Sequence, residues 1–193
     1  MEEYLTLIAA ALLVNNFVLT RFLGICPFLG VSQHLYNAAG MAGAVIFVQT
    51  LACGVTGAIN QFILVPAGLE YMQTIAFILV IASLVQLVEI FLQRFSPPLY
   101  KALGIYLPLI TTNCAIMGAA VLCADRSYTA VKATVFGFSA ALGFALALAL
   151  IASLRERLDL AQVPRCFSGT PIALITAGIL AMAFMGFAGL GAG

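Results

Sequence analysis

Two short segments, Gly24-Ile25-Cys26-Pro27-Phe28-Leu29-Gly30 and Thr112-Asn113-Cys114-Ala115-Ile116-Met117-Gly118, give the first indication of the fold. In each segment a cysteine is followed four residues later by a glycine, and the two cysteines stand 88 positions apart, nearly half the chain. Each segment lies inside an apolar stretch that is too long for one simple helix. Two thiols at corresponding places of two half-chains suggest a metal centre on an axis of internal symmetry, with a redox role.

The composition is that of a protein embedded in lipid. Of the 193 residues, 64% are hydrophobic and only 8% are charged, and the mean hydropathy is +1.15. A soluble domain carries roughly a quarter charged residues. The formal net charge of +1 gives no sign of nucleic-acid binding. The acidic start Met1-Glu2-Glu3, with no small-residue cleavage site after it, does not have the pattern of a removable signal peptide.

Apolar stretches long enough to cross a bilayer, which takes about 20 residues, occur six times. We therefore expect an all-α integral membrane protein that forms a single transmembrane domain over residues 1–193. Small residues four positions apart, such as Gly54/Ala58 and Gly137/Ala141, are interpreted as ordinary helix-packing contacts. The expected spans are Tyr4–Phe22, Met41–Ile59, Tyr71–Phe91, Leu99–Ala124, Ala133–Leu154 and Pro171–Leu190.

Three spans in each half place the second half upside down relative to the first, which is an inverted repeat. We expect repeat 1 over about residues 1–95 and repeat 2 over about residues 96–193. The distribution of Lys and Arg predicts the orientation, because cytoplasmic loops carry the excess. With alternating spans, one side receives six basic residues and the other receives Arg126 and Lys132. Both termini are then expected on the outer, periplasmic side, with Arg94 and the loop from Arg155 to Arg165 in the cytoplasm.

The first helix of each repeat is predicted to break near its cysteine. Proline is favoured at the first helical position, so a helix is expected to restart at Pro27 with Cys26 at its N-cap. In the fourth span, Pro108 disfavours helix just before it, and the run Thr111-Thr112-Asn113 offers capping side chains. Cys114 is then expected in the first turn of a new helix. A helix N-terminus favours thiolate, the form in which cysteine binds metal.

An iron–sulfur cluster needs four thiolates in the usual case, and two symmetric cysteines supply half of them. A homologous second subunit or a second copy would supply the rest. Zinc also takes four thiolates, but a zinc site between membrane helices would be only structural, and we rank it below iron–sulfur. The sequence has no Cys-x-x-Cys pair, and Cys53 and Cys123 are interpreted as small buried hydrophobic residues.

Polar residues within the expected spans are functional candidates, because burying them without partners is costly. Glu89 is a candidate for ion or proton movement, although it could instead pair with Arg94 near the end of its span. His34 is interpreted as a structural loop residue. The remaining polar candidates are Asn15, Asn16, Gln49 and Gln86.

Longer motifs extend over almost the whole chain: Val14–Leu19, Phe22–Phe28, Leu103–Ala115, Ile151–Leu158, Ile172–Gly178 and Ala183–Phe187. Together they resemble the A subunits of Rnf electron-transport complexes. The E subunit of the sodium-pumping NADH:quinone oxidoreductase is a close relative, but the Asn-Asn-Phe-Val run and Cys-Pro-Phe favour Rnf.

The resemblance implies six transmembrane helices in two inverted halves and a homologous sister subunit of opposite topology. It implies an intramembrane [2Fe–2S] cluster shared by the pair, with Cys26 and Cys114 as this chain's ligands. It also implies electron flow between ferredoxin and NAD through FMN, riboflavin and further iron–sulfur centres of partner subunits. Na⁺ or H⁺ would cross the bacterial inner membrane in step. Cys53, Cys123 and Cys166 fall outside the motifs, so no role is implied for them.

Two other classes remain open from the residues alone. Inverted repeats with broken helices are also typical of small secondary transporters. A purely structural anchor for peripheral redox subunits would leave Cys26 and Cys114 dispensable. Visible iron–sulfur absorption in a purified complex would separate electron transfer from both alternatives.

Overall fold

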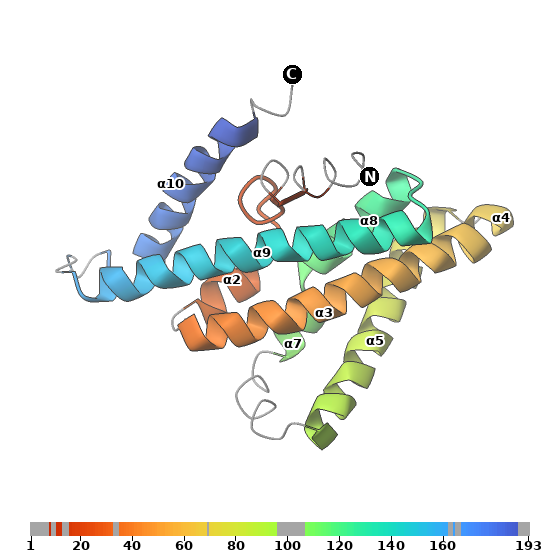
Figure 1. The fold of residues 1–193 in the computed structure, drawn as a ribbon, viewed down its shortest axis with the longest axis horizontal. Coiled ribbons are helices and arrows are strands. Elements are labelled where there is room, and N and C mark those ends of the chain that lie inside the picture. Colours follow the sequence, from red (N-terminus) through yellow and green to blue (C-terminus); the bar gives the residue numbers. More distant parts are fainter. Residues whose placement is uncertain are drawn as a thin grey trace.

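The fold is a helical membrane architecture (Figure 1). The computed structural model describes residues 8, 11–12, 16–32, 35–68, 70–95, 107–161, 164 and 167–188, and within these ranges there are helices and turns but no strand. A π-helical turn covers Asn60–Leu64 and a 3₁₀ turn covers Glu70–Met72. The helices are α2 (Ile25–Val31), α3 (Leu35–Ile59), α4 (Val65–Ala67), α5 (Gln73–Phe95), α7 (Leu107–Thr111), α8 (Cys114–Asp125), α9 (Ala130–Asp159) and α10 (Thr170–Ala188).

Within the described residues, four helical stretches are long and apolar enough to cross a membrane, and α10 is a shorter apolar helix. These stretches correspond to the second to sixth predicted spans. Of the first predicted span, Tyr4–Phe22, the structure describes residues 8, 11–12 and 16–22. Residues 17–21 form turns rather than helix, so the predicted helix does not extend to Phe22. The four long stretches are Leu35–Leu64, Gln73–Phe91, Pro108–Asp125 and Ala130–Asp159. An integral membrane fold is thus supported.

The long helices α3 and α9 lie side by side and run in opposite directions, and they form the centre of the molecule (Figure 1). Small residues allow this close approach: a Cβ at Gly137 would lie only 2.6 Å from the Cβ of Cys53, and one at Gly57 only 2.9 Å from the Cβ of Ala133. In lipid, helices associate through van der Waals packing rather than through a hydrophobic drive, so glycine at such contacts sets the helix separation.

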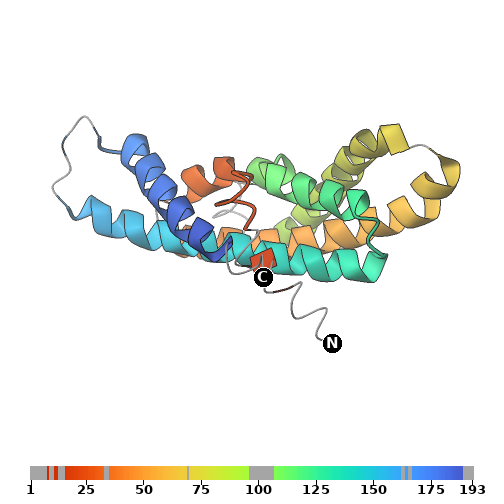
Figure 2. The same cartoon turned by 90° about the horizontal axis from the view of Figure 1, so that it is seen from above.

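The remaining helices are arranged around the α3–α9 pair. Figure 2 shows α2 and α8 on the same side of the pair, while α5 and α10 extend from its two opposite ends (Figure 1). The buried core between these elements is dominated by large apolar side chains, among them Phe28, Phe77, Phe144, Ile116 and Leu148. Most side chains of α5 are exposed or only half-buried, so this helix presents a wide apolar face to lipid or to another subunit.

Two consecutive residues of α9 hold the connection between α2 and α3. The Arg155 guanidinium donates through Nη1 to the Leu29 carbonyl (2.9 Å) and to Ser32 Oγ (2.8 Å), at the C-terminal end of α2. The Glu156 carboxylate accepts from the Leu35 N–H (2.9 Å), at the start of α3. Each charge complements the partial charge of the helix end that it contacts.

Two predicted helical segments were shorter than the observed helices. The predicted span Met41–Ile59 is part of a helix that starts at Leu35, because a helix continues past its apolar section wherever its backbone can still hydrogen-bond. In the same way α9 runs to Asp159, so Arg155 and Arg157 lie on a helix rather than in the predicted loop. The predicted packing role of Gly54 and Gly137 is confirmed, since both face the α3–α9 contact.

Candidate metal centre

The first cysteine segment forms the short helix α2. Gly24 precedes it with a left-handed backbone (φ 85°), and the first helical hydrogen bond runs from the Phe28 N–H to the Gly24 carbonyl (3.2 Å). Cys26 is the second residue of the helix and is exposed, whereas Pro27 and Phe28 are buried. The predicted start was therefore two residues late. Proline is tolerated anywhere in the first turn, because those N–H groups have no partner within the helix.

The second cysteine segment forms the start of α8. Asn113 is the N-cap, and its Oδ1 accepts a hydrogen bond from the Ala115 N–H (3.0 Å). The preceding helix α7 ends at Thr111, so the fourth span breaks between Thr111 and Cys114, as predicted. Cys114 is the first residue of α8 and is half-buried. Asn113, one of the predicted capping residues, is thus the residue that caps α8.

The fold brings the two cysteine segments into direct contact. The backbone N–H of Gly24 donates a hydrogen bond to Cys114 Sγ over 2.8 Å, across 90 residues of sequence. Only glycine fits there, because a Cβ on Gly24 would lie 2.9 Å from Phe144 Cε2 and 3.1 Å from the Ala115 Cβ. Sequence reasoning missed this role of Gly24, whose only local signal is that it closely precedes the Cys-Pro pair.

One polar atom at this contact has no partner. Asn113 is 3% exposed, and its Nδ2 is buried without a hydrogen bond while its Oδ1 caps α8. Buried donors are nearly always satisfied, so an unpaired one indicates a missing acceptor. The atom belongs to the residue next to Cys114. An anionic group bound at the cysteine would supply the acceptor that the polypeptide does not.

The surface beside the first cysteine is unusual for a membrane-embedded segment. Arg21, Phe22 and Cys26 are all exposed, and Phe22 has a left-handed backbone (φ 54°) that a bulky residue adopts only under strain. The Arg21 guanidinium lies 6.0 Å from the centre of the Phe17 ring, and Phe17 packs beside Gly118 of α8. Arg21 is therefore placed, through Phe17, beside the helix that Cys114 begins.

The other cysteines lie elsewhere. Cys53 and Cys123 are buried in one apolar cluster, consistent with the predicted packing role. Cys166 lies outside the described residues. In the part of the chain that the structure describes, no three His, Cys, Asp or Glu side chains gather as a metal site. The two cysteine segments therefore offer at most half of a four-thiolate site.

The polar candidate residues differ in burial and in hydrogen bonding. Asn16 is fully buried and satisfied, because its Nδ2 donates to the Gly143 carbonyl (2.8 Å) and its Oδ1 accepts from the Val18 N–H (3.1 Å). Gln49 is buried, but its Oε1 has no partner. Glu89 is half-buried and Gln86 is exposed, and both lie on α5. Asn15 and His34 lie outside the described residues.

Comparison with known proteins gives a consistent result. The family model described as Rnf-Nqr subunit, membrane protein, matches residues 4–191. The chain belongs to the Rnf-Nqr family. The match includes both cysteine segments and every described helix, so the Gly24–Cys114 contact is part of the Rnf-Nqr domain itself.

Similar proteins within the Rnf-Nqr family carry a common name. The chain is 58% identical over 190 residues to a protein of Syntrophotalea carbinolica that is named as the A subunit of an ion-translocating oxidoreductase complex, with 98% of both chains covered. Proteins of the same name from Edwardsiella ictaluri and Yersinia enterocolitica are 56% and 55% identical over the same coverage.

Proposed function

We propose that this chain is the membrane subunit of an ion-translocating electron-transport complex, and that Cys26 and Cys114 supply half of the ligands of an intramembrane [2Fe–2S] cluster. The names of relatives that are 55–58% identical support the first part. The observation that carries the second part is the hydrogen bond from Gly24 to Cys114 Sγ, because it joins the two cysteine segments at one place.

The residues around Cys114 have the chemistry that an anionic cluster requires. The thiol stands at the N-terminus of α8, whose partial positive charge favours thiolate. The Gly24 N–H already donates to the sulfur, and the buried Asn113 Nδ2 offers a second donor. When bound, an iron–sulfur cluster supplies one-electron transfer, and hydrogen bonds to its sulfurs help to set its potential.

The exposure of Cys26 supports a site completed by another polypeptide. An exposed thiol at membrane depth would face lipid in an isolated chain, and the neighbouring exposed Arg21 would be costly there. A homologous sister subunit of opposite topology would cover both and contribute the remaining two thiolates. Ferredoxin- and NAD-linked electron transfer, FMN, riboflavin and further iron–sulfur clusters are then assigned to partner subunits.

The helix arrangement supports the proposed six-helix fold with two inverted three-helix repeats. The antiparallel pair of α3 and α9, with α5 and α10 leaving its opposite ends, is the arrangement that two oppositely inserted halves would produce (Figure 1). Among the described basic residues other than Arg21, Arg94, Arg155 and Arg157 lie at one end of the spans, and Arg126 and Lys132 lie at the other. We assign the first end to the cytoplasm and both termini to the periplasm of an inner membrane.

The test is iron content and electron paramagnetic resonance of the assembled complex. Cys26→Ser and Cys114→Ser should abolish the signal of one cluster, because a serine hydroxyl stays protonated and binds iron poorly. Cys53→Ser and Cys123→Ser are matched controls and should retain it. The amount of sister subunit recovered separates ligand loss from failed assembly. Full iron and full activity in Cys114→Ser would place the cluster elsewhere.

The competing proposal is a small secondary transporter with an inverted-repeat fold. It predicts a colourless protein that moves a substrate without partner subunits, and it leaves the unpaired Asn113 Nδ2 unexplained. Iron-linked visible absorption in the purified complex argues against it.

A further inference from the structure

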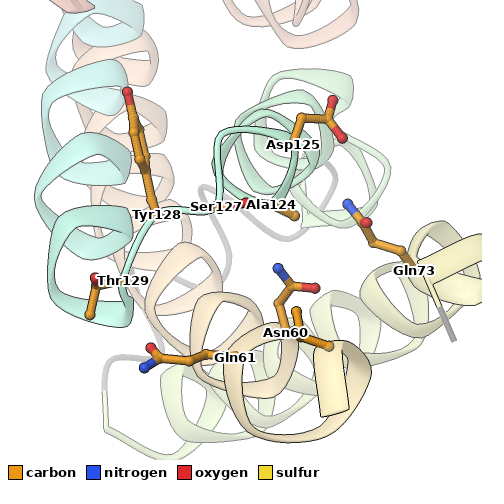
Figure 3. A pocket seen from close by; sticks show the side chains of 9 residues that line it. Asn60, Gln61, Gln73, Ala124, Asp125, Ser127, Tyr128 and Thr129 are labelled. Carbon is orange, nitrogen blue, oxygen red and sulfur yellow. The ribbon is translucent and has the colours of Figure 1, made fainter. Parts of the chain in front are cut away.

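A polar cavity of about 520 Å³ opens at one end of the spanning helices (Figure 3). It lies where α8 ends, where α5 and α9 begin, and where the π-helical turn follows α3. π-helical turns are rare and are frequently found at functional sites. Figure 3 shows Asn60, Gln73 and Asp125 arranged around the same space. The lining includes Asn60, Gln61, Gln73, Asp125, Ser127 and Thr129.

The chemistry of the lining is that of a hard-cation site. Amide, hydroxyl and carboxylate oxygens are the ligands that hard cations prefer. Asp125 is the one formally charged side chain among the described residues that line the cavity. The cavity is much larger than a dehydrated ion, so it suits a cation that keeps part of its water shell.

The position of Asp125 strengthens this assignment. It is the last residue of α8, where the helix end carries partial negative charge, so a carboxylate there is electrostatically unfavourable. The next residue, Arg126, does not neutralise it through any ion pair that the described residues show. Its Nη1 instead donates to the Tyr128 hydroxyl (3.2 Å). A bound cation would balance the local negative potential.

A row of buried polar and sulfur-bearing side chains continues from the cavity along α3. Gln49, Cys53, Thr56 and Asn60 are spaced by four, three and four residues, so they share one helix face, and all are at most 8% exposed. The Gln49 Oε1 has no partner, and a buried carbonyl oxygen of this kind needs a proton donor or a cation. From Asn60 to Gln49 the helix rises about 16 Å.

The same distance separates the cavity from the candidate metal centre. Cys114 and Asp125 are the first and last residues of α8, so about 16 Å of one rigid helix joins them. We infer that the cavity is a vestibule that binds a hydrated monovalent cation, with the buried α3 row directly behind Asn60. This inference rests on the proposed ion-translocating function and deepens it by naming the cation's place of entry or exit.

The test uses Na⁺ as the probe and the assembled complex in detergent. Wild-type complex should broaden the ²³Na resonance, and Asp125→Asn should remove most of the excess linewidth. In the Asp125→Asn complex, the concentration of Na⁺ that half-saturates electron-transfer activity should rise about tenfold. This rise is equivalent to the loss of about 1.4 kcal/mol of binding free energy. Asn60→Ala should act in the same direction.

Asp159→Asn is the matched control, because Asp159 is also an exposed carboxylate at the end of a helix, α9, and does not line the cavity. It should leave linewidth and half-saturation unchanged. Equal behaviour of Asp125→Asn and Asp159→Asn, or a wild-type complex without Na⁺ broadening, would overturn the vestibule.

Failure of the cluster proposal would look different. If the wild-type complex lacks the cluster signal while Asp125→Asn still changes Na⁺ binding, the vestibule stands and the electron-transfer role falls. If the cluster signal depends on Cys114 but Na⁺ binding does not depend on Asp125, the electron-transfer role stands and the vestibule falls.

Discussion

The backbone N–H of Gly24 and the sulfur of Cys114 are joined by a hydrogen bond of 2.8 Å. Through this bond the start of α2 is fixed to the start of α8, although the two residues come from different halves of the sequence. The contact depends on a residue without a side chain, so it can be tested without touching either cysteine.

Gly24→Ala should destabilise the protein by about 1–3 kcal/mol, because alanine is strained at φ 85° and its Cβ would press on Phe144. Thermal unfolding of the purified complex measures this. The control is Gly43→Ala, at an open helical position of α3, which should be neutral or stabilising by up to about 1 kcal/mol. Equal unfolding temperatures for the two variants would contradict the steric argument.

Asn113 has two separable roles. Asn113→Asp keeps an oxygen that caps α8, so helix stability should change little, but it removes the unpaired donor and adds a negative charge beside Cys114. Iron retention should therefore fall.

Asn113→Ala removes the cap as well and should cost about 1 kcal/mol of stability in addition. Iron content and unfolding temperature of both variants check the separation. Full iron in Asn113→Asp would mean that Nδ2 does not face the bound group.

Arg155→Gln should loosen the end of α2, because a charge-assisted pair of hydrogen bonds to Leu29 and Ser32 is lost. Amide hydrogen exchange in α2 should quicken several-fold. Arg157→Gln, two residues away on an exposed position, is the control and should leave exchange in α2 unchanged.

The proposed orientation makes opposite predictions for two exposed positions. Ser127→Cys, in the turn after α8, should react with a membrane-impermeant thiol reagent from the periplasmic side. Leu160→Cys, which is at a 90% exposed position after α9, should react only from the cytoplasmic side. Labelling of Ser127→Cys from the cytoplasm would show that the orientation is inverted.

The helical architecture and the break in the fourth span could be predicted from local sequence. Apolar length is enough to predict spans, and Pro108 with the Asn113 cap is enough to predict where α8 starts. The start of α2 was missed by two residues, because a proline in the first turn does not say which of the first positions it occupies.

The contacts that define the candidate site could not be predicted in this way. The pairing of Gly24 with Cys114, of Asn16 with Gly143 and of Arg155 with Leu29 each joins residues far apart in sequence. Such pairings depend on how segments that are distant in sequence pack against one another, which no local pattern encodes.

The hydrogen bonds of Arg155 to the end of α2 also restrict the position of Cys26. A hydrogen bond from Gly24 to Cys114 fixes the start of α2, and one from Arg155 to the Leu29 carbonyl fixes its end. Cys26 lies between these two hydrogen bonds, so the backbone that carries it is held in place even though its side chain is exposed. A second polypeptide that docks on this surface therefore meets a ligand whose place is already fixed, and less ordering entropy is lost when the two halves join.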